Sequence, residues 1–338
     1  MCDRLEDVPT NHMAGRMPIL RNDRPMISAP RIFDRDIIAA RGGKNRVDPW
    51  QPYAFLVEPE HAAGGLIEDV ATIFLTNREC PFHCLMCDLW KNTLDTRVPD
   101  GAIPAQIDFA LERLPAAQHI KLYNSANFFD PQSIPRDDWP AIAEQVRSFK
   151  TVIVENHPRL CTDDCRIFRD LTGTQLEVAL GLETIHPDVL PRLNKQMTVD
   201  DFESAVSRLR DWDILTRAFI LLRPPYLTEE EGIEWACRSI EFAFDCGVNC
   251  ASVIPVRGGN GIMEHLAAEG LYSPPSLRAL EDVLDYGLQL HHGRVFVDLW
   301  DGERFATCPE CGPPRRARLE RMNLSQVSEA RVKCQNCD

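Results

Sequence analysis

A short stretch in the first third of the chain, Cys80-Pro81-Phe82-His83-Cys84-Leu85-Met86-Cys87, carries the strongest information on the fold. Its cysteines follow a C-x3-C-x2-C pattern, and an irregular loop with this spacing can turn three thiolates toward one centre. Thiolates are the ligands that soft metals and iron-sulfur clusters prefer, and three of them leave one iron of a four-iron cluster without a protein ligand. The stretch therefore predicts an open metal centre on Cys80, Cys84 and Cys87. The alternatives are a zinc loop completed by a residue such as His83, and a cluster that only transfers electrons.

Short apolar runs rich in β-forming residues surround this stretch, one before it and six after it. The intervals between them leave room for helices, and two carry clear helix starts, Thr198 followed by Asp201 and Thr228 followed by Glu231. Gly247 suits the left-handed residue that ends the second of these helices. Strands that alternate with helices predict an α/β protein whose parallel sheet is rolled into a partial or full barrel, with a flat doubly wound sheet as the alternative. The expected strands are 70–75, 119–123, 151–154, 176–182, 216–222, 249–254 and 294–299.

A C-x3-C-x2-C loop directly after the first strand of such a barrel resembles the radical S-adenosylmethionine (SAM) enzyme superfamily. The resemblance implies a partial (β/α)6-type barrel, a 4Fe-4S cluster on Cys80, Cys84 and Cys87, and SAM bound at the remaining iron. In that superfamily one electron from the cluster splits SAM to a 5'-deoxyadenosyl radical, which abstracts hydrogen from the substrate. One departure is Met86, because the residue before the third cysteine is usually aromatic there. Methionine is a polarizable apolar replacement that can still pack beside an adenine.

Polar residues follow several predicted strands, at the end of the barrel that carries the active site in this architecture. Ser125 and Asn127 lie where many superfamily members have a Gly-Gly-Glu segment that holds the SAM amino group, and we expect them to take its place. Glu155 and Glu183 can accept from ribose hydroxyls or the SAM ammonium group, and Arg223 can bind a carboxylate through two parallel hydrogen bonds. The alternatives are structural, namely a capped turn at Ser125 and Asn127 and ion pairs for the charged residues.

Longer motifs resemble one branch of the superfamily, the radical SAM subunit of archaeosine synthase, and more distantly the catalytic subunit of elongator. The similarity spans roughly residues 70–280. The archaeosine relative acts on a lysine-modified deazaguanine in tRNA, so the resemblance implies a tRNA-modifying enzyme as one candidate. The matching motifs are Ser125 with Phe128 and Asp130, Glu155 with Pro158, Gly181 to Thr184, Asn194-Lys195, and Pro224-Pro225-Tyr226-Leu227-Thr228-Glu229.

The charge distribution argues against a protein whose whole surface binds nucleic acid or an anionic membrane. The chain carries 37 basic and 51 acidic residues, a net charge of −14. Residues 1–49 hold 9 basic and 7 acidic groups and residues 308–338 hold 6 and 4, which leaves 22 basic and 40 acidic groups between them. Phosphate contacts provide much of the affinity for RNA, so this balance disfavours tRNA as a partner. An unidentified small molecule, peptide or modified base is therefore the first expectation for the substrate, and tRNA is the alternative.

Two C-x2-C pairs near the C-terminus, Cys308 with Cys311 and Cys334 with Cys337, are separated by 22 residues. This pattern is typical of a tetrahedral four-cysteine site, usually zinc, which supplies folding energy to a segment too short for its own core. A second iron-sulfur cluster is the alternative, because four thiolates also satisfy one. Three of the arginines between the pairs, Arg315, Arg316 and Arg318, are expected in a solvated loop, with a contact to a partner or an acidic substrate as the alternative.

The chain is expected to divide into an N-terminal extension (1–65), a radical SAM barrel (66–302) and a four-cysteine, zinc-ribbon-like tail (303–338). No apolar run reaches the roughly 18 residues of a membrane span, and the first residues lack the apolar segment of a secretory signal. We therefore expect a cytoplasmic protein without membrane contact, whose 13 cysteines are mostly reduced thiols or metal ligands. Four of them, Cys161, Cys165, Cys246 and Cys250, are expected to be ordinary packing residues.

These features predict an enzyme in which the cluster supplies the difficult chemistry and the barrel positions SAM against a substrate hydrogen. A one-electron step implies a reductant such as flavodoxin or ferredoxin. The contrasting class is a non-catalytic protein in which the iron-sulfur and zinc sites support contacts to RNA or another protein.

Overall fold

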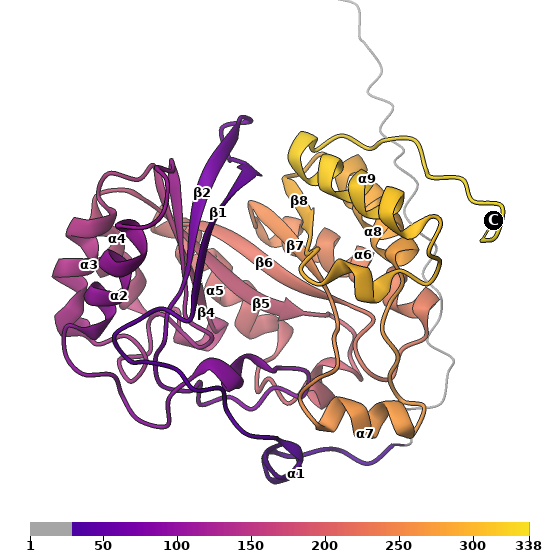
Figure 1. The fold of residues 1–338 in the computed structure, drawn as a ribbon, viewed down its shortest axis with the longest axis horizontal. Coiled ribbons are helices and arrows are strands. Elements are labelled where there is room, and N and C mark those ends of the chain that lie inside the picture. The colour runs from indigo at the N-terminus through magenta and orange to yellow at the C-terminus, as the bar shows by residue number, and fades with distance from the viewer. Residues whose placement is uncertain (1–28, 338) are drawn as a thin grey trace, which may run out of the picture. The chain divides into compact units, whose positions relative to one another are not determined.

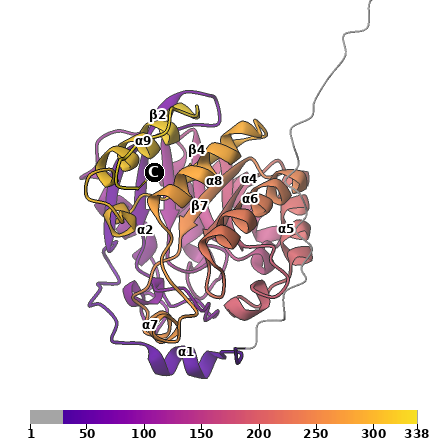
Figure 2. The same ribbon diagram turned by 90° about the vertical axis from the view of Figure 1, so that its right-hand side faces the viewer.

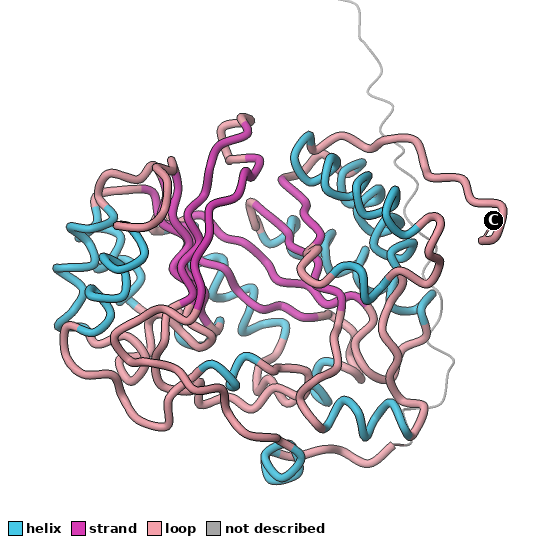
Figure 3. The backbone as a smooth tube through the Cα atoms, in the orientation of Figure 1, coloured by secondary structure: helices cyan, strands magenta, loops and turns pink. Residues whose placement is uncertain are grey.

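The computed structural model describes residues 29–337, so the first part of the predicted N-terminal extension, 1–28, lies outside the described residues. From Arg31 onward the chain forms one compact unit. Its centre is an eight-stranded sheet in which the strands follow one another in chain order (Figures 1 and 3). The strands are β1 (Ala54–His61), β2 (Ile67–Phe74), β3 (His119–Tyr123), β4 (Thr151–Asn156), β5 (Gln175–Glu183), β6 (Leu215–Leu222), β7 (Cys250–Pro255) and β8 (Arg294–Val297).

The predicted fold class is confirmed: β2 to β8 coincide with the seven expected strands, pair in parallel and form an open half-barrel. The capping boxes at Thr198 and Thr228 start helices as expected, and Gly247 ends the second of these with φ 98°. Figures 1 and 2 show the helices against the outer face of the sheet. They are α2 (Ala102–Leu111), α3 (Trp139–Val146), α4 (Asp163–Thr172), α5 (Val199–Asp211), α6 (Glu229–Cys246) and α8 (Leu277–Gln289), while α1 (Asp34–Ala40), α7 (Ile262–Ala268) and α9 (Gly312–Ser325) lie elsewhere.

The sheet begins one strand earlier than the sequence indicated. Residues 54–61, assigned to the N-terminal extension, form β1, which pairs antiparallel with β2. Pro59 and three charged or titratable side chains mask the strand pattern in this segment. Proline is tolerated here because β1 is an edge strand, so its missing N–H need not serve a second neighbour. The Gly64-Gly65 turn between two β-rich runs was the available hairpin signal.

Alternating side chains of the strands separate an apolar outer face from a polar inner face. Ile120 and Leu122 of β3 are fully buried in the core shared with the helices, together with Cys161 and Cys165 of the α4 region. Their packing role is the one expected for these cysteines. Cys250 is buried as well, and Cys246 is half-buried.

The inner face carries a buried network of ion pairs that joins strands distant in the sheet. Glu60 of β1 contacts Lys121 Nζ of β3 at 2.5 Å and Arg217 Nη2 of β6 at 2.6 Å. Arg217 and Arg294 of β8 both bind Glu177 of β5, at 2.7 and 2.8 Å. Burial opposes ionisation of Glu60, but Arg217 and Lys121 outweigh it and hold the pKa of this carboxyl well below its usual range. The network draws β1 toward β6, so the sheet curves into a half-barrel.

An aromatic layer lies beyond this charged network, toward the carboxyl ends of the strands. The Phe74 ring of β2 lies edge-on to Tyr123 of β3, with centroids 6.3 Å apart, and Tyr123 lies edge-on to Phe219 of β6 at 6.2 Å. These rings are only half-buried. Along the inner face, the charged network is therefore followed by a layer of aromatic side chains, which lies next to the loops that follow the strands.

The C-terminal region differs from the expected zinc ribbon, because a helix rather than a hairpin separates its cysteine pairs. This helix, α9, covers the free edge of β8. The Asn323 amide pairs with the Val297 backbone through bonds of 3.0 and 2.8 Å, and the Gln326 amide pairs with Val295 through bonds of 2.8 and 2.9 Å. On the opposite edge, His61 Nδ1 of β1 donates to the Leu324 carbonyl at 2.9 Å. The tail thus satisfies an edge strand and bridges both sides of the half-barrel.

The arginines of this region are not in a solvated loop. Arg315 and Arg318 of α9 are buried, and both bind Glu281 of α8. Arg316 is half-buried and pairs with Glu303 and Glu320. Helix formation from Gly312 turns two of the three guanidinium groups inward, toward acidic residues that sequence spacing alone could not pair with them. Within residues 29–337, no helix has the length and apolarity needed to cross a membrane.

Candidate functional site

The cluster loop, residues 78–94, leaves the carboxyl end of β2 and contains Cys80, Cys84 and Cys87. Three asparagines from loops after other strands donate hydrogen bonds to it. Asn194, after β5, donates to the His83 carbonyl at 2.7 Å, and Asn260, after β7, donates to the Leu85 and Cys87 carbonyls at 2.7 and 3.2 Å. Asn127, after β3, donates from Nδ2 to Cys80 Sγ at 3.2 Å. The loop is therefore positioned from several strand ends at once.

Part of the predicted N-terminal extension binds the cluster loop through hydrogen bonds and ion pairs. Asp34 of α1 accepts from Asn194 at 2.6 Å and lies 3.3 Å from His83 Nδ1. Hydrogen bonds from these two side chains outweigh burial and lower the pKa of Asp34. Farther along, Arg41 and Lys44 bind Glu79, beside the first cysteine, at 2.6 and 2.7 Å. Residues 34–44 thus seal the cluster loop from outside, a role that the irregular sequence of this segment did not indicate.

The arrangement of Cys80, Cys84 and Cys87 fits a multi-iron cluster better than a single ion. In the described part of the chain, the three sulfurs do not belong to any set of ligand atoms that all lie within 4.8 Å of one another. Thiolates on one zinc ion lie about 3.8 Å apart when each Zn–S bond is about 2.3 Å. Thiolates that bind separate irons of a cubane lie farther apart, because the irons themselves are separated. Three thiolate donors that do not all lie within 4.8 Å of one another are compatible with a 4Fe-4S cluster that has one open iron.

Burial and a nearby lysine act in opposite directions on the three thiols of the loop. Burial raises the pKa of Cys80 to about 11 and those of Cys84 and Cys87 to about 12. Lys195 opposes this shift at all three sulfurs. The free thiols are thus protonated near neutral pH, and metal binding must release their protons.

A buried ion pair stands beside the sulfurs. Lys195 Nζ lies 2.5 Å from Glu183 Oε1, and both side chains are nearly inaccessible. Burial alone would lower the pKa of Lys195, but Glu183 and the neighbouring Cys84 raise it above its usual range, so the ammonium stays charged. Gly181 leaves the room for this pair, because a Cβ there would overlap both Glu183 Oε1 and Lys195 Nζ.

Three other predicted SAM ligands already have partners within the protein. Ser125 Oγ is 2.8 Å from the Tyr53 hydroxyl, and Asn127 is bound to Cys80 and to the His157 amide. Glu155 Oε1 accepts from the backbone amides of Asn124 and Ser125, both at 2.6 Å. These contacts fix the loop that occupies the place of the Gly-Gly-Glu segment. The structure brings Asn127, Glu183 and the cluster loop together, and the expected SAM contacts stay predictions.

Arg223 lies apart from this group. Its Nη1 donates to Glu229 at 3.1 Å and to the Pro274 carbonyl at 2.9 Å. Its backbone is left-handed, with φ 54°, and it sits directly on Gly232, where a Cβ would meet the Arg223 Cα at 2.8 Å. The ion pair considered as the structural alternative for this arginine is thus present.

The half-buried Glu155 carboxyl makes a pH-dependent contribution to stability. Burial raises its pKa to about 7, although backbone amides oppose this shift. Since the folded pKa lies above the unfolded one, stability falls as pH rises from about 4.5 through about 7. Glu155→Gln keeps an oxygen acceptor but cannot ionise. Between pH 5 and pH 8, we expect the free energy of unfolding of the wild type to fall by about 1–2 kcal/mol relative to that of Glu155→Gln.

Anaerobic urea denaturation of both proteins at both pH values measures this change. If the free energies of the two proteins differ by the same amount at pH 5 and at pH 8, the pKa of Glu155 is not raised.

His157 is a residue of the site that sequence analysis passed over. Its ring stacks on Phe82 of the cluster loop, with centroids 3.9 Å apart and an interplanar angle of 13°. Nδ1 accepts from the Arg159 amide at 3.2 Å, so Nε2 carries the proton and donates to the Lys195 carbonyl at 3.0 Å. Burial, with Lys195 nearby, lowers the pKa of His157 to about 3, so the ring is neutral. Its position after a strand end, next to Glu155, was the available signal.

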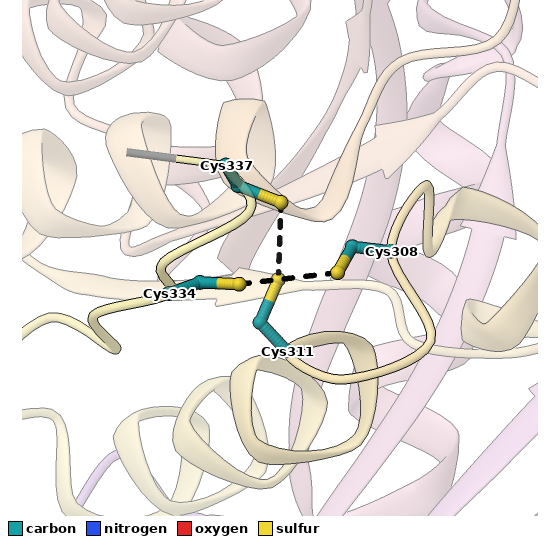
Figure 4. A group of neighbouring side chains, drawn as sticks. All are labelled: Cys308, Cys311, Cys334 and Cys337. Carbon is teal, nitrogen blue, oxygen red and sulfur yellow. Dashed lines mark hydrogen bonds between the residues drawn. The ribbon is translucent and has the colours of Figure 1, made fainter.

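The four tail cysteines form a second candidate metal site, as predicted. Figure 4 shows their sulfurs pointing toward one another. Sγ of Cys308 lies 3.9 Å from that of Cys334, and Sγ of Cys311 lies 3.7 Å from that of Cys337. All four ligand atoms lie within 4.8 Å of one another, the only such group among residues 29–337. The geometry supports a four-cysteine metal site.

Sequence comparison finds relatives, although no family model matches the chain. An uncharacterized protein of Methanocaldococcus jannaschii is 23% identical over 288 residues, which cover 78% of this chain and 79% of that protein. Archaeosine synthase subunit beta of Methanosarcina acetivorans is 26% identical over 183 residues, 51% of this chain. The match also spans about half of that subunit's length (51%). The predicted resemblance to the archaeosine synthase branch is confirmed.

Structure comparison supports the fold. Methylornithine synthase superposes with a TM-score of 0.50 at 15% identity, covering 72% of this chain and 68% of that one. An Elp3 from Methanocaldococcus infernus, with residues 1–46 deleted, gives 0.48 at 15% identity over 65% and 59% of the two chains. These relatives belong to the radical SAM superfamily. The superposition on methylornithine synthase supports the half-barrel fold of this chain, and its sequence relatives named archaeosine synthase subunit beta belong to the radical SAM superfamily.

Proposed function

We propose that this chain is a radical SAM enzyme. The observation that carries the proposal is the cluster loop. It places three half-buried cysteines after the carboxyl end of β2, and side chains from other strand ends hold it in place. Cys80, Cys84 and Cys87 would hold a 4Fe-4S cluster, which would supply the electron for reductive cleavage of SAM.

The residues of this chain position the reactants and exclude water around that centre. The Glu183–Lys195 pair stands next to Cys84 and carries both signs of charge, which suits the ammonium and carboxylate groups of SAM. The half-buried rings of Phe74, Tyr123 and Phe219 form an apolar wall below the strand ends. A water-poor wall protects a radical from side reactions. The substrate of this site is unidentified.

The direct test uses anaerobic protein with a reconstituted cluster, SAM and dithionite. We expect 5'-deoxyadenosine and methionine in equal amounts, measured by chromatography. A protein that binds iron and SAM but forms neither product would favour the non-catalytic alternative. Flavodoxin or ferredoxin in place of dithionite then tests the expected biological reductant.

A tRNA substrate is the second candidate, and the similarity to archaeosine synthase subunit beta favours it. The structure weakens the electrostatic support for this candidate. Residues 308–338 hold more basic than acidic groups, yet Arg315, Arg318 and Arg321 bind acidic side chains of the protein itself. An unidentified small molecule, peptide or modified base therefore stays ahead of tRNA. A gel shift with total tRNA at two salt concentrations distinguishes them.

For the tail site we propose a single zinc ion rather than a second cluster. The two short sulfur separations, 3.9 and 3.7 Å, match the roughly 3.8 Å edge of a tetrahedron with Zn–S bonds of about 2.3 Å. Arg315 Nε also donates to Cys311 Sγ at 3.3 Å, which offsets part of the negative charge of four thiolates.

Metal analysis of a Cys308→Ser, Cys311→Ser protein tests the tail assignment. We expect about one equivalent of zinc to be lost while iron in the barrel is retained, because each C-x2-C pair supplies half of the ligands. Elemental analysis by mass spectrometry measures both metals in parallel with the wild type. Loss of about four equivalents of iron instead would identify a second cluster.

A further inference from the structure

Asn127 occupies a position at which a side chain can act on a cluster without binding a metal. Its side chain is 2% exposed, and each end of its amide has one partner. Nδ2 donates to Cys80 Sγ at 3.2 Å, and Oδ1 accepts from the His157 backbone amide at 2.8 Å. The amide is thus oriented: its donor end points at a cluster sulfur because its acceptor end is held by the backbone after β4.

The support behind Asn127 is itself rigid. His157, whose amide orients Asn127, stacks on Phe82 of the cluster loop and donates to the Lys195 carbonyl at 3.0 Å. Among the three asparagines that hold the loop, Asn127 is the one that contacts a sulfur. Asn194 and Asn260 bind only main-chain carbonyls of the loop. Their comparison separates an effect on the cluster from an effect on the loop.

We propose that Asn127 is a positioning residue that raises the reduction potential of the cluster through its N–H···S bond to Cys80, instead of contacting SAM. This inference rests on the proposed cluster at Cys80, Cys84 and Cys87. A hydrogen bond to a ligand sulfur stabilises the more negative, reduced cluster more than the oxidised one, and such bonds are among the factors that set cluster potentials. Reduction adds one electron to the cluster, and no covalent bond of Asn127 forms or breaks.

The test compares the midpoint potential of the reconstituted wild type with those of Asn127→Ala and Asn127→Asp, by EPR-monitored redox titration. Asn127→Asp retains the acceptor for the His157 amide and loses the donor. We expect the equilibrium constant for one-electron reduction to fall about tenfold in Asn127→Ala, a negative shift of about 59 mV for one electron. Asn127→Asp is expected to shift at least as far, because it also places a carboxyl group beside the sulfur.

Asn260→Ala is the matched control, because it loosens the same loop without touching a sulfur. We expect its potential to stay at the wild-type value in the fraction of protein that holds iron. As a direct readout, the reduced wild-type cluster should show a solvent-exchangeable proton coupling in ENDOR spectra that is missing from Asn127→Ala. The affinity for SAM is expected to be equal in the wild type, Asn127→Ala and Asn260→Ala. It is measured by the change that SAM causes in the EPR spectrum of the cluster.

The outcomes separate the two layers of the proposal. A wild type that binds no EPR-active cluster overturns the proposed function. A wild type with a normal cluster and Asn127 variants with an unchanged potential overturn the role of Asn127. If the variants instead lose SAM affinity at constant potential, Asn127 is a SAM ligand, as the sequence indicated. An equal shift in Asn260→Ala assigns the effect to loop mobility.

Discussion

Replacing Cys84 by alanine is expected to abolish reductive cleavage of SAM. Cys84 is the middle ligand of the three, and its sulfur lies beside the buried Lys195. With two thiolates left, the remaining sulfurs cannot hold a cubane with one open iron, so both the electron source and the SAM-binding position are lost. We expect the rate of 5'-deoxyadenosine formation to fall by at least about 100-fold, since even substitutions behind a metal ligand cost about 10- to 100-fold.

Cys246→Ala is the matched control for this variant. It removes a half-buried cysteine that belongs to neither candidate metal site. This variant is expected to retain the iron content, the visible absorption and the SAM cleavage of the wild type. Should Cys84→Ala keep both its iron and its activity, the cluster must be bound elsewhere, and the proposed function fails.

Among substitutions of buried residues in the tail, Arg318→Met is expected to lower the free energy of unfolding most. Arg318 is 1% exposed, and its Nη2 binds both oxygens of Asp285 at 2.8 and 3.0 Å while its Nη1 binds Glu281 at 3.2 Å. Methionine fills similar space but leaves two buried carboxylates with fewer positive partners. Breaking a buried pair from one side costs about 3–5 kcal/mol. We expect the free energy of unfolding to fall by about 3 kcal/mol, the lower end of this range, because Arg315 and Arg331 still bind these carboxylates.

The same substitution tests whether the tail holds the sheet closed. Arg318 also donates to the Glu329 and Ala330 carbonyls, which precede Cys334 in the chain. Its loss should therefore loosen both α9 and the second cysteine pair. Hydrogen exchange at the Val295 and Val297 amides, which donate to Gln326 and Asn323, reports on the first effect. Zinc retention under a chelator reports on the second.

Arg321→Met provides the comparison, because Arg321 pairs with Glu329 at the exposed surface. An exposed ion pair contributes at most about 1 kcal/mol, so urea denaturation should show little change. A double variant, Arg318→Met with Asp285→Asn, should recover part of the loss by removing an unpaired charge. If Arg318→Met unfolds at the same urea concentration as Arg321→Met, the buried network does not anchor the tail.

Local patterns identified much of this molecule. The seven parallel strands, the capped starts of α5 and α6, the glycine end of α6 and the four-cysteine group of the tail could all be predicted from spacing and periodicity. Each depends on residues a few positions apart, where one backbone conformation brings side chains together. The strand β1 was missed because Pro59 and charged residues interrupt its alternation, and these are tolerated only at a sheet edge.

The partners of the predicted site residues needed the tertiary structure. Asp34 meets Asn194 across 160 positions, Asn260 meets the Leu85 carbonyl across 175, and Glu60 meets Arg217 across 157. Sequence proposed Ser125, Asn127 and Glu155 for SAM, whereas folding gives each a protein partner near the cluster loop.

The sequence by itself determined where seven of the strands, the capped starts of two helices and the grouped tail cysteines lie along the chain, because those depend on local geometry. Only the tertiary structure decided which acidic residues pair with Arg315 and Arg318. It also decided which segment covers the cluster loop and which side-chain amide donates to a sulfur. Such pairings arise when curvature of the sheet brings distant strand ends to one rim, and no pattern along the chain encodes that distance.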